Sequence, residues 1–264
     1  MSRSLLLATL AQIWLVGTVS AQFSTPVPEL IRMLNEGNPS AQFEAAKQLR
    51  DHAQCGKRFA EVVAPLLRHL DSRDLKMRRT VADALRETMF VVQSPPADLL
   101  KRLRQSLSDK DDLVAIPVAY ALSYLGRSAV PTLLDILSEK DPTKVDRRTR
   151  LYALRSLAYS FSRGKRHVES VPCLLSLMKS DDPEIRSMTA WGLASVSFAV
   201  KAPSKKMVQA LLDLLNDPTS KIHGCIVDAL CNLDKPVIPD LIRILDRGTN
   251  RQKAGAAAAI GKMN

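Results

Sequence analysis

Apolar residues recur in short helical stripes that are separated by polar breaks along most of the chain. Between residues 170 and 193, one stripe comes before Asp182-Pro183 and a second stripe follows it. The residue before a proline avoids α geometry, and an Asp side chain caps the helix that follows it. Neither stripe could be buried by its own helix alone. The pattern therefore predicts two short antiparallel helices that need neighbours.

The same unit recurs with a period of about 36 residues. The residues equivalent to Leu193 are Leu49, Leu85, Leu122, Leu157, Leu230 and Ile260. Eleven positions before each of these seven residues stands a helix-capping type: Asn38, Asp74, Asp111, Asp146, Asp182, Thr219 and Thr249. Only the fourth unit is out of step, by an insertion at residues 140–144. These columns predict an all-α domain of about seven antiparallel helix pairs over residues 22–264.

The units resemble the HEAT repeat family, including the related repeats of phycobilisome-linked lyases. The family signature is an Asp, a Val-Arg pair and then Ala-rich and Leu positions, and it appears at residues 74–85 and 182–193. The first and third units depart from it, with Gln42 and Ala115 where Arg is usual. The resemblance implies a right-handed α-solenoid whose second helices line the concave side. It also implies that the Asp and Arg of the signature form ladders between repeats.

In three units this Asp and Arg stand four residues apart at the start of the second helix: Asp74/Arg78, Asp146/Arg150 and Asp182/Arg186. Residues at this spacing share one helix face, and Asp is favourable at a helix N-terminus. We interpret these six residues as scaffold rather than as a functional site.

The first 21 residues have the features of a secretory signal. Arg3 precedes an apolar run from Leu5 to Val19, and small residues up to Ala21 come before Gln22. The run is short for a membrane span, so cleavage after Ala21 is expected, with an uncleaved anchor as the alternative. The prediction is an exported protein, periplasmic or extracellular.

The chain is basic, with a formal net charge of +11 at pH 7. A basic surface attracts acidic proteins, anionic lipids and anionic polymers, or it serves only solubility. An oxidising compartment would permit the four cysteines to form disulfides. Their positions do not favour pairing, because Cys225 and Cys231 point to different faces of one predicted helix. We expect buried, unpaired thiols.

No motif for catalysis stands out. The four histidines, His52, His69, His167 and His223, have no metal-ligand spacing, and none is followed by Glu as in HEAT-repeat hydroxylases. A Gly-rich phosphate loop, a Gly-x-Ser-x-Gly elbow and a Cys-x-x-Cys motif are all missing from the sequence. The sequence therefore predicts no enzyme, no cofactor and no metal site.

One column of each second helix varies in type from unit to unit. It comprises three positions of each unit: six residues before, two residues before and two residues after the residue equivalent to Leu193. These positions are four residues apart and share one helix face. A column that only packed the core would stay apolar, whereas this one includes Tyr, Trp and Arg, the types that dominate binding hot spots. We predict a concave partner-binding surface centred on Arg79, Tyr120, Tyr124, Arg155, Tyr159 and Trp191. The alternative is that the aromatic side chains wedge between adjacent repeats.

A second candidate site is a basic ridge in the connectors. It consists of Arg163, Lys165, Arg166, Lys201, Lys205 and Lys206, helped by Arg147 and Arg148. Without interleaved aromatics, such a ridge suits phosphate or sulfate contacts better than specific nucleic-acid recognition. The alternative is a set of ordinary solvated loops.

The favoured function is a non-enzymatic, exported scaffold that binds another protein on its concave second-helix face. An electrostatic binder of an anionic polymer or membrane surface, and an accessory subunit in lyase-type chemistry, remain as alternatives.

Overall fold

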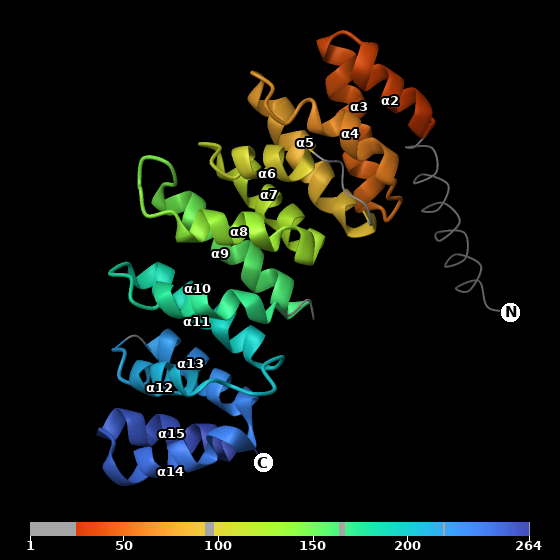
Figure 1. Ribbon diagram of the computed structural model, residues 1–264. Coiled ribbons are helices and arrows are strands. Elements are labelled where there is room, and N and C mark those ends of the chain that lie inside the picture. Colours follow the sequence, from red (N-terminus) through yellow and green to blue (C-terminus); the bar gives the residue numbers. More distant parts are fainter. Residues whose placement is uncertain (1–24, 93–97, 164–166, 219, 264) are drawn as a thin grey trace, which may run out of the picture. The chain divides into compact units, whose positions relative to one another are not determined.

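The computed structural model describes residues 25–92, 98–163, 167–218 and 220–263 (Figure 1). Within these residues the regular structure is helical, with no strand. The predicted signal at residues 1–21 lies outside them, as do Lys165 and Arg166. The chain divides into two compact units, residues 1–102 and 103–264.

The first unit begins with two helix pairs. Helix α2 (Val27–Glu36) packs on α3 (Pro39–Gln54), and α4 (Val63–Leu67) packs on α5 (Leu75–Thr88), which also contacts α3. The short helices η1 (Ala60–Val62) and η2 (Met89–Val91) flank the second pair. Helix α6 (Leu99–Ser106) crosses the division between the units.

The second unit continues the alternation of first and second helices. After α7 (Asp112–Leu125), the pairs are α8 (Val130–Ser138) with α9 (Arg147–Ser162), α10 (Val171–Leu177) with α11 (Pro183–Ser197), α12 (Lys205–Leu214) with α13 (Ser220–Leu233), and α14 (Ile238–Arg247) with α15 (Asn250–Lys262). The connectors contain η3 (Gly126–Ser128), η4 (Val168–Ser170) and η5 (Lys235–Val237).

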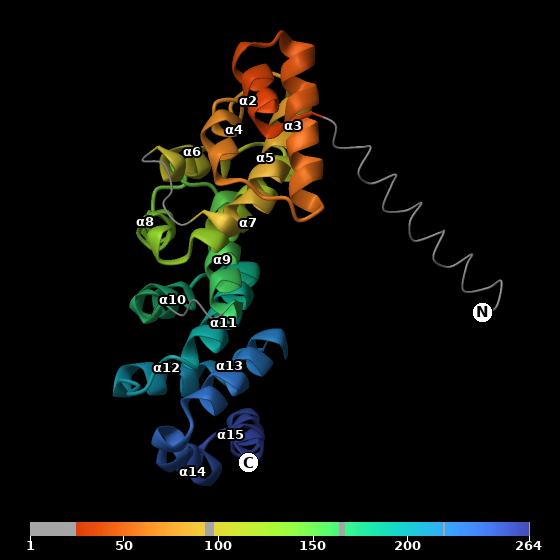
Figure 2. The ribbon, with the colours of Figure 1, turned by 90° about the vertical axis from the view of Figure 1, so that its right-hand side faces the viewer.

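Two layers are visible within the second unit, one of first helices and one of second helices (Figure 2). Each second helix packs on the next one, from α7 through α9, α11 and α13 to α15. The predicted series of helix pairs is thereby confirmed. The predicted insertion at residues 140–144 lies in the connector between α8 and α9.

The capping column is confirmed at six of its seven positions. The side-chain oxygens of Asn38, Asp74, Asp111, Asp146, Asp182 and Thr249 each accept a hydrogen bond from a first-turn amide of the second helix. Thr219, the seventh, lies outside the described residues. Asp111 is typical: its Oδ1 atom is 2.9 Å from the amide nitrogen of Leu113. These caps satisfy donors that the helix itself leaves unpaired.

The leucine column forms the centre of the core. Its members from Leu49 to Leu230 are at most 3% exposed, whereas Ile260 in the last pair is half-buried. Ile260 lies on α15, which packs against a second helix on one side, α13. Packing of each repeat against the adjacent ones buries this column from Leu49 to Leu230.

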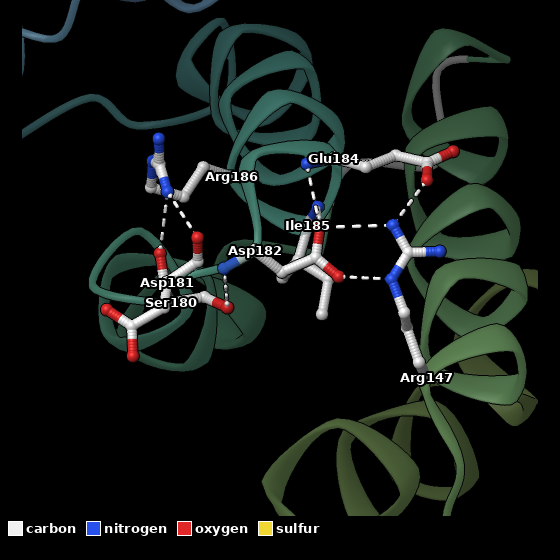
Figure 3. A network of polar contacts seen from close by, with 7 residues as sticks. All are labelled: Arg147, Ser180, Asp181, Asp182, Glu184, Ile185 and Arg186. Carbon is white, nitrogen blue, oxygen red and sulfur yellow. Dashed lines mark hydrogen bonds and ion pairs between the residues drawn. The ribbon is translucent and has the colours of Figure 1, made fainter.

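The signature Arg of the fifth unit bonds to backbone carbonyls and to the next repeat. Arg186 Nη1 donates to the carbonyl oxygens of Ser180 and Asp181, at 2.9 and 3.1 Å, just before its own helix (Figure 3). Arg186 Nε donates to Asp217 Oδ2 in the next repeat, at 3.2 Å. The long guanidinium side chain therefore satisfies two carbonyls of the connector that precedes α11.

Asp182 instead pairs with the preceding repeat. The Arg147 guanidinium, at the start of α9, donates to Asp182 and also to Glu184 Oε2, at 2.6 Å for the latter (Figure 3). The amides of Glu184 and Ile185 donate to Asp182 Oδ1 as well, at 2.9 and 3.4 Å. The Arg147 hydrogen bond and these amides hold the pKa of Asp182 below its usual value, although partial burial opposes them. An ion pair between repeats is therefore present here, but its cation is Arg147; the signature arginine of that unit, Arg150, donates to the Glu139 carbonyl oxygen instead.

The cysteine thiols are free, as expected, but the prediction that they are all buried is wrong. Cys55 is exposed at the C-terminus of α3, and Cys173, Cys225 and Cys231 are half-buried. Burial raises the pKa of the Cys173 thiol, which is therefore protonated at neutral pH.

No single helix among the described residues is long and apolar enough to cross a membrane. One bent pair, residues 112–128 with 130–138, passes the same test by length and composition.

We predict that Asp111→Ala destabilises the protein by about 1 kcal/mol, because the Leu113 amide loses its acceptor. Asp111→Asn retains an acceptor oxygen and serves as the control, with a loss well below that of the alanine variant. Urea denaturation measures both. Equal losses for the two variants would show that the cap contributes through charge rather than through the hydrogen bond.

We also predict that Arg147→Ala raises the pKa of Asp182, because the largest cause of its depression is removed. Arg148→Ala, at the adjacent position, should leave this pKa unchanged. Since the folded-state pKa of Asp182 is depressed, its contribution to stability is complete above the unfolded value, near 3.8, and is lost as the pH falls through the folded value. NMR titration of the carboxyl carbon measures the pKa; an unchanged value in Arg147→Ala contradicts the assignment.

Candidate functional site

Five of the six predicted partner-binding residues lie on neighbouring second helices of the second unit. Tyr120 and Tyr124 are on α7, Arg155 and Tyr159 are on α9, and Trp191 is on α11. All five are half-buried, so each side chain both packs and faces solvent. Arg79 is also half-buried but lies on α5, in the first unit. The site described below is built from the second unit alone.

Three aromatic side chains form a row across the second helices α7, α9 and α11. The Tyr120 and Tyr159 rings are 4.6 Å apart between centroids, and the Tyr120 hydroxyl donates to the Tyr159 hydroxyl oxygen at 2.8 Å. The Tyr159 and Trp191 rings meet edge to face at 5.3 Å. Both ring distances fall in the range that is favourable for aromatic pairs. This aromatic row, Tyr120-Tyr159-Trp191, therefore links three repeats while part of each side chain stays exposed.

Guanidinium groups flank the aromatic row. The Arg163 Cζ atom lies 3.9 Å from the centroid of the Tyr124 ring, and its Nη2 atom donates to the Tyr124 hydroxyl oxygen at 2.9 Å. Arg155 lies over the ring of Tyr152, with Cζ 5.8 Å from the centroid. Contacts of this kind attract a cation to the ring face and restrict the guanidinium. The arrangement presents flat, preorganised cationic and aromatic groups beside one another.

A groove of about 560 Å³ continues from Trp191 between α11 and α13. It is lined by Glu184, Ser187, Met188, Trp191, Gly224, Cys225 and Asp228. Ser187, Trp191, Gly224 and Asp228 belong to the variable column identified in the sequence. A Cβ atom added at Gly224 would meet nothing within 4 Å, which shows how open the α13 side of the groove is.

The acidic groups of this groove are already paired. Glu184 binds Arg147, and Asp228 Oδ1 accepts from Lys262 Nζ at 2.6 Å. The Asp228 hydrogen bond raises the pKa of Lys262, and burial raises the pKa of the Cys225 thiol. The groove is therefore close to neutral, with an indole, a thioether and a protonated thiol as its principal apolar groups. Its chemistry favours an apolar or aromatic side chain of a ligand.

Sequence reasoning missed Arg163, Met188 and Cys225 as parts of this surface. Arg163 follows Tyr159 by four residues, so extending the variable column by one more step would have found it. Met188 and Cys225 each stand three residues before a column member, Trp191 and Asp228, respectively. Helical spacing indicates such neighbours, but only the packing of α11 on α13 shows that they line a groove.

The predicted basic ridge is distributed over different parts of the second unit. Arg163 contacts Tyr124 on the second-helix layer, whereas Lys205 and Lys206 are exposed on the first helix α12. Lys201 is exposed in the connector before α12. The two helping arginines are engaged with neighbouring repeats: Arg147 with α11, and Arg148 Nη1 with the Lys110 carbonyl oxygen at 2.7 Å and Asp112 Oδ1 at 2.9 Å.

The histidines have packing roles. His69 Nε2 is 2.9 Å from the Leu34 carbonyl oxygen, and His167 is buried with Nε2 3.3 Å from Ser160 Oγ. His52 is buried on α3, and desolvation lowers its pKa. Across the described residues, no group of three or more His, Cys, Asp or Glu side chains is arranged to hold a metal ion.

Comparison with known proteins identifies the repeats. Residues 130–223 match the family model for HEAT repeats. The match extends from the start of α8 through α12 to the start of α13. The described residues form an all-α series of helix pairs in each unit, the fold class that HEAT and armadillo repeat proteins share. No curated protein matches the chain.

The chain is also similar to solved structures. An engineered protein superposes with a TM-score of 0.53 at 20% sequence identity, over 90% of this chain and 68% of its own. A structure from work on a phosphorylation switch between cadherin and β-catenin gives 0.46 at 16% identity, over 90% of this chain and 52% of that one. A computationally designed armadillo repeat protein for modular peptide recognition gives 0.43 at 13% identity, over 90% and 100%. The first of these likenesses shows the fold.

We predict that Tyr159→Phe destabilises the protein by about 1 kcal/mol, because the hydroxyl contact with Tyr120 is lost while the ring packing remains. Tyr120→Phe should cost a similar amount. The double variant should then cost clearly less than the sum, since both changes remove one shared hydrogen bond. Denaturation of the three variants completes the cycle, and additive losses would show that the two hydroxyls are not coupled.

Proposed function

We propose that this protein is a non-enzymatic scaffold of the HEAT-repeat type, which binds another protein on the second-helix face of its second unit. The observation that carries the proposal is the half-exposed aromatic row across α7, α9 and α11, which leads into the groove between α11 and α13. Repeats of this kind provide extended surfaces for binding, with side chains contributed by successive repeats.

The composition of this face supports a protein ligand. Tyr, Trp and Arg are the residue types that most often dominate the binding energy of protein interfaces. Here they are held by one another, through the Tyr120-Tyr159 hydrogen bond and the Arg163 contact with Tyr124. Side chains that are already restricted lose little conformational entropy on binding. A partner that places an apolar or aromatic side chain beside Trp191 would bury the exposed part of the indole.

The place of action is part of the proposal. Export through a secretory signal is supported by Arg3, the apolar run to Val19 and the small residues up to Ala21. Cleavage would leave residues 22–264 as the mature protein. An uncleaved anchor would leave the same surface on the outer side of the membrane. N-terminal sequencing of the protein from its source distinguishes the two, because cleavage after Ala21 leaves Gln22 as the first residue.

The proposed function is tested with Tyr124→Ala/Arg155→Ala, which removes two half-exposed groups outside the aromatic row. The matched control is Thr132→Ala/Lys140→Ala on α8 and its connector, which also removes one polar and one cationic side chain. The full chain and both variants capture proteins from secreted and cell fractions, followed by elution in rising salt and mass spectrometry. We expect one protein that is retained at high salt by the wild type and the control and is lost, at least tenfold, from the test variant.

Melting temperatures accompany the experiment, because loss of binding is informative only if both variants remain folded. Retention of the same proteins by all three chains, or of none by the wild type, contradicts the proposal. If the test variant is unstable, Tyr124→Phe/Arg155→Lys replaces it. That variant keeps the packing and alters only the hydroxyl and the planar guanidinium.

A further inference from the structure

We propose a second binding site, in the first-helix layer of the second unit, for a linear polyanion that carries phosphate or sulfate groups. Two grooves lie on either side of α12. One, of about 630 Å³, is formed with α10 and includes Lys179, Ser204 and Lys206 in its lining. The other, of about 470 Å³, is formed with α14 and includes Lys205, Lys206 and Arg243. Lys206 belongs to both.

Both grooves carry positive charge that the protein leaves uncompensated. Lys179, Lys205 and Lys206 are exposed, and none takes part in an ion pair with another described residue. In the first groove, two lysines face one carboxylate, Asp213, which accepts from Gln209 Nε2 at 2.8 Å. In the second groove, Arg243 pairs with Asp240 and so leaves the two lysines unopposed. Each groove therefore presents a positive potential to solvent.

The lysines differ in this respect from the arginines of the same unit. Arg147, Arg148 and Arg186 all donate to carboxylates or carbonyls of neighbouring repeats. Lys205 and Lys206 also occupy the first turn of α12, where the helix dipole makes a cation unfavourable and an anion favourable. A bound anion would compensate both the lysines and the dipole. Scaffold formation gives no reason for lysines at these positions.

The geometry favours a chain of anionic groups over a single ion or a flat surface. Packed helices are about 8–10 Å apart, so anionic groups in the two grooves would be separated by roughly 10 Å. One phosphate cannot reach both grooves, whereas a flexible polymer can lie across α12 and contact Lys206 from each side. A membrane presents its head groups in a plane, and lysines that line grooves engage such a plane less well than a chain that enters them.

The site lies in the other layer from the aromatic row (Figure 2). The grooves share no lining residue with the groove beside Trp191, so the two sites can be tested separately. Tyr124→Ala/Arg155→Ala should retain full affinity for the polyanion.

Binding of fluorescently labelled polyphosphate to the full chain tests the site. We expect Lys205→Gln/Lys206→Gln to weaken binding about tenfold and to reduce the salt dependence, because two charge contacts are lost. Lys140→Gln/Lys144→Gln removes the same net charge from the connector between α8 and α9 and should leave the affinity unchanged. All four lysines are exposed, so both variants should keep the wild-type melting temperature. Equal weakening in the two variants overturns the site and leaves only the net charge.

Two further probes identify the form of the ligand. Inorganic phosphate, at the same total phosphate concentration, should compete far less well than polyphosphate if two grooves are bridged. Vesicles of phosphatidylcholine with phosphatidylglycerol should bind weakly and with no difference between the two lysine variants. Effective competition by inorganic phosphate, or vesicle binding as tight as polyphosphate binding and dependent on Lys205 and Lys206, overturns the assignment to a linear polymer.

Discussion

No helix pair of this protein can bury its apolar face by itself, and the rest of the structure depends on this constraint. The leucines from Leu49 to Leu230 are almost fully buried because second helices pack on second helices along each unit. Stability in such an arrangement is a sum of the repeats and their interfaces.

The polar groups at the helix ends complete this scaffold and leave the faces of the helices to other uses. Side-chain caps such as Asp111 satisfy the first amides, and arginines such as Arg186 satisfy carbonyls of the connector before the helix. The leucine column fills the core, and the capping column satisfies the helix ends. The residues of the variable column are therefore less constrained by folding. Its aromatic and cationic side chains in the second unit are the basis for the proposed protein-binding surface.

The sequence predicted the scaffold well because its causes are local. A capping side chain acts on amides two or three residues away, so Asp74, Asp146 and Thr249 could be recognised from spacing alone. The partners of the arginines could not be predicted in this way, because a guanidinium group reaches acceptors in several elements. Arg186, for example, donates to a connector carbonyl and to Asp217 in the next repeat. The groove beside Trp191 could not be predicted from the sequence either, because it depends on how far α11 and α13 lie apart around Gly224.

The aromatic row has a consequence for how binding and local opening are connected. Tyr120, Tyr159 and Trp191 come from three successive repeats, and each interface between repeats can open with its own free energy. A ligand that contacts the whole row requires both interfaces to be closed at once. Its binding energy therefore stabilises the closed state of both interfaces among α7, α9 and α11. Occupancy should reduce local opening in the middle of the unit, and it should slow amide exchange even in helices that the ligand does not touch.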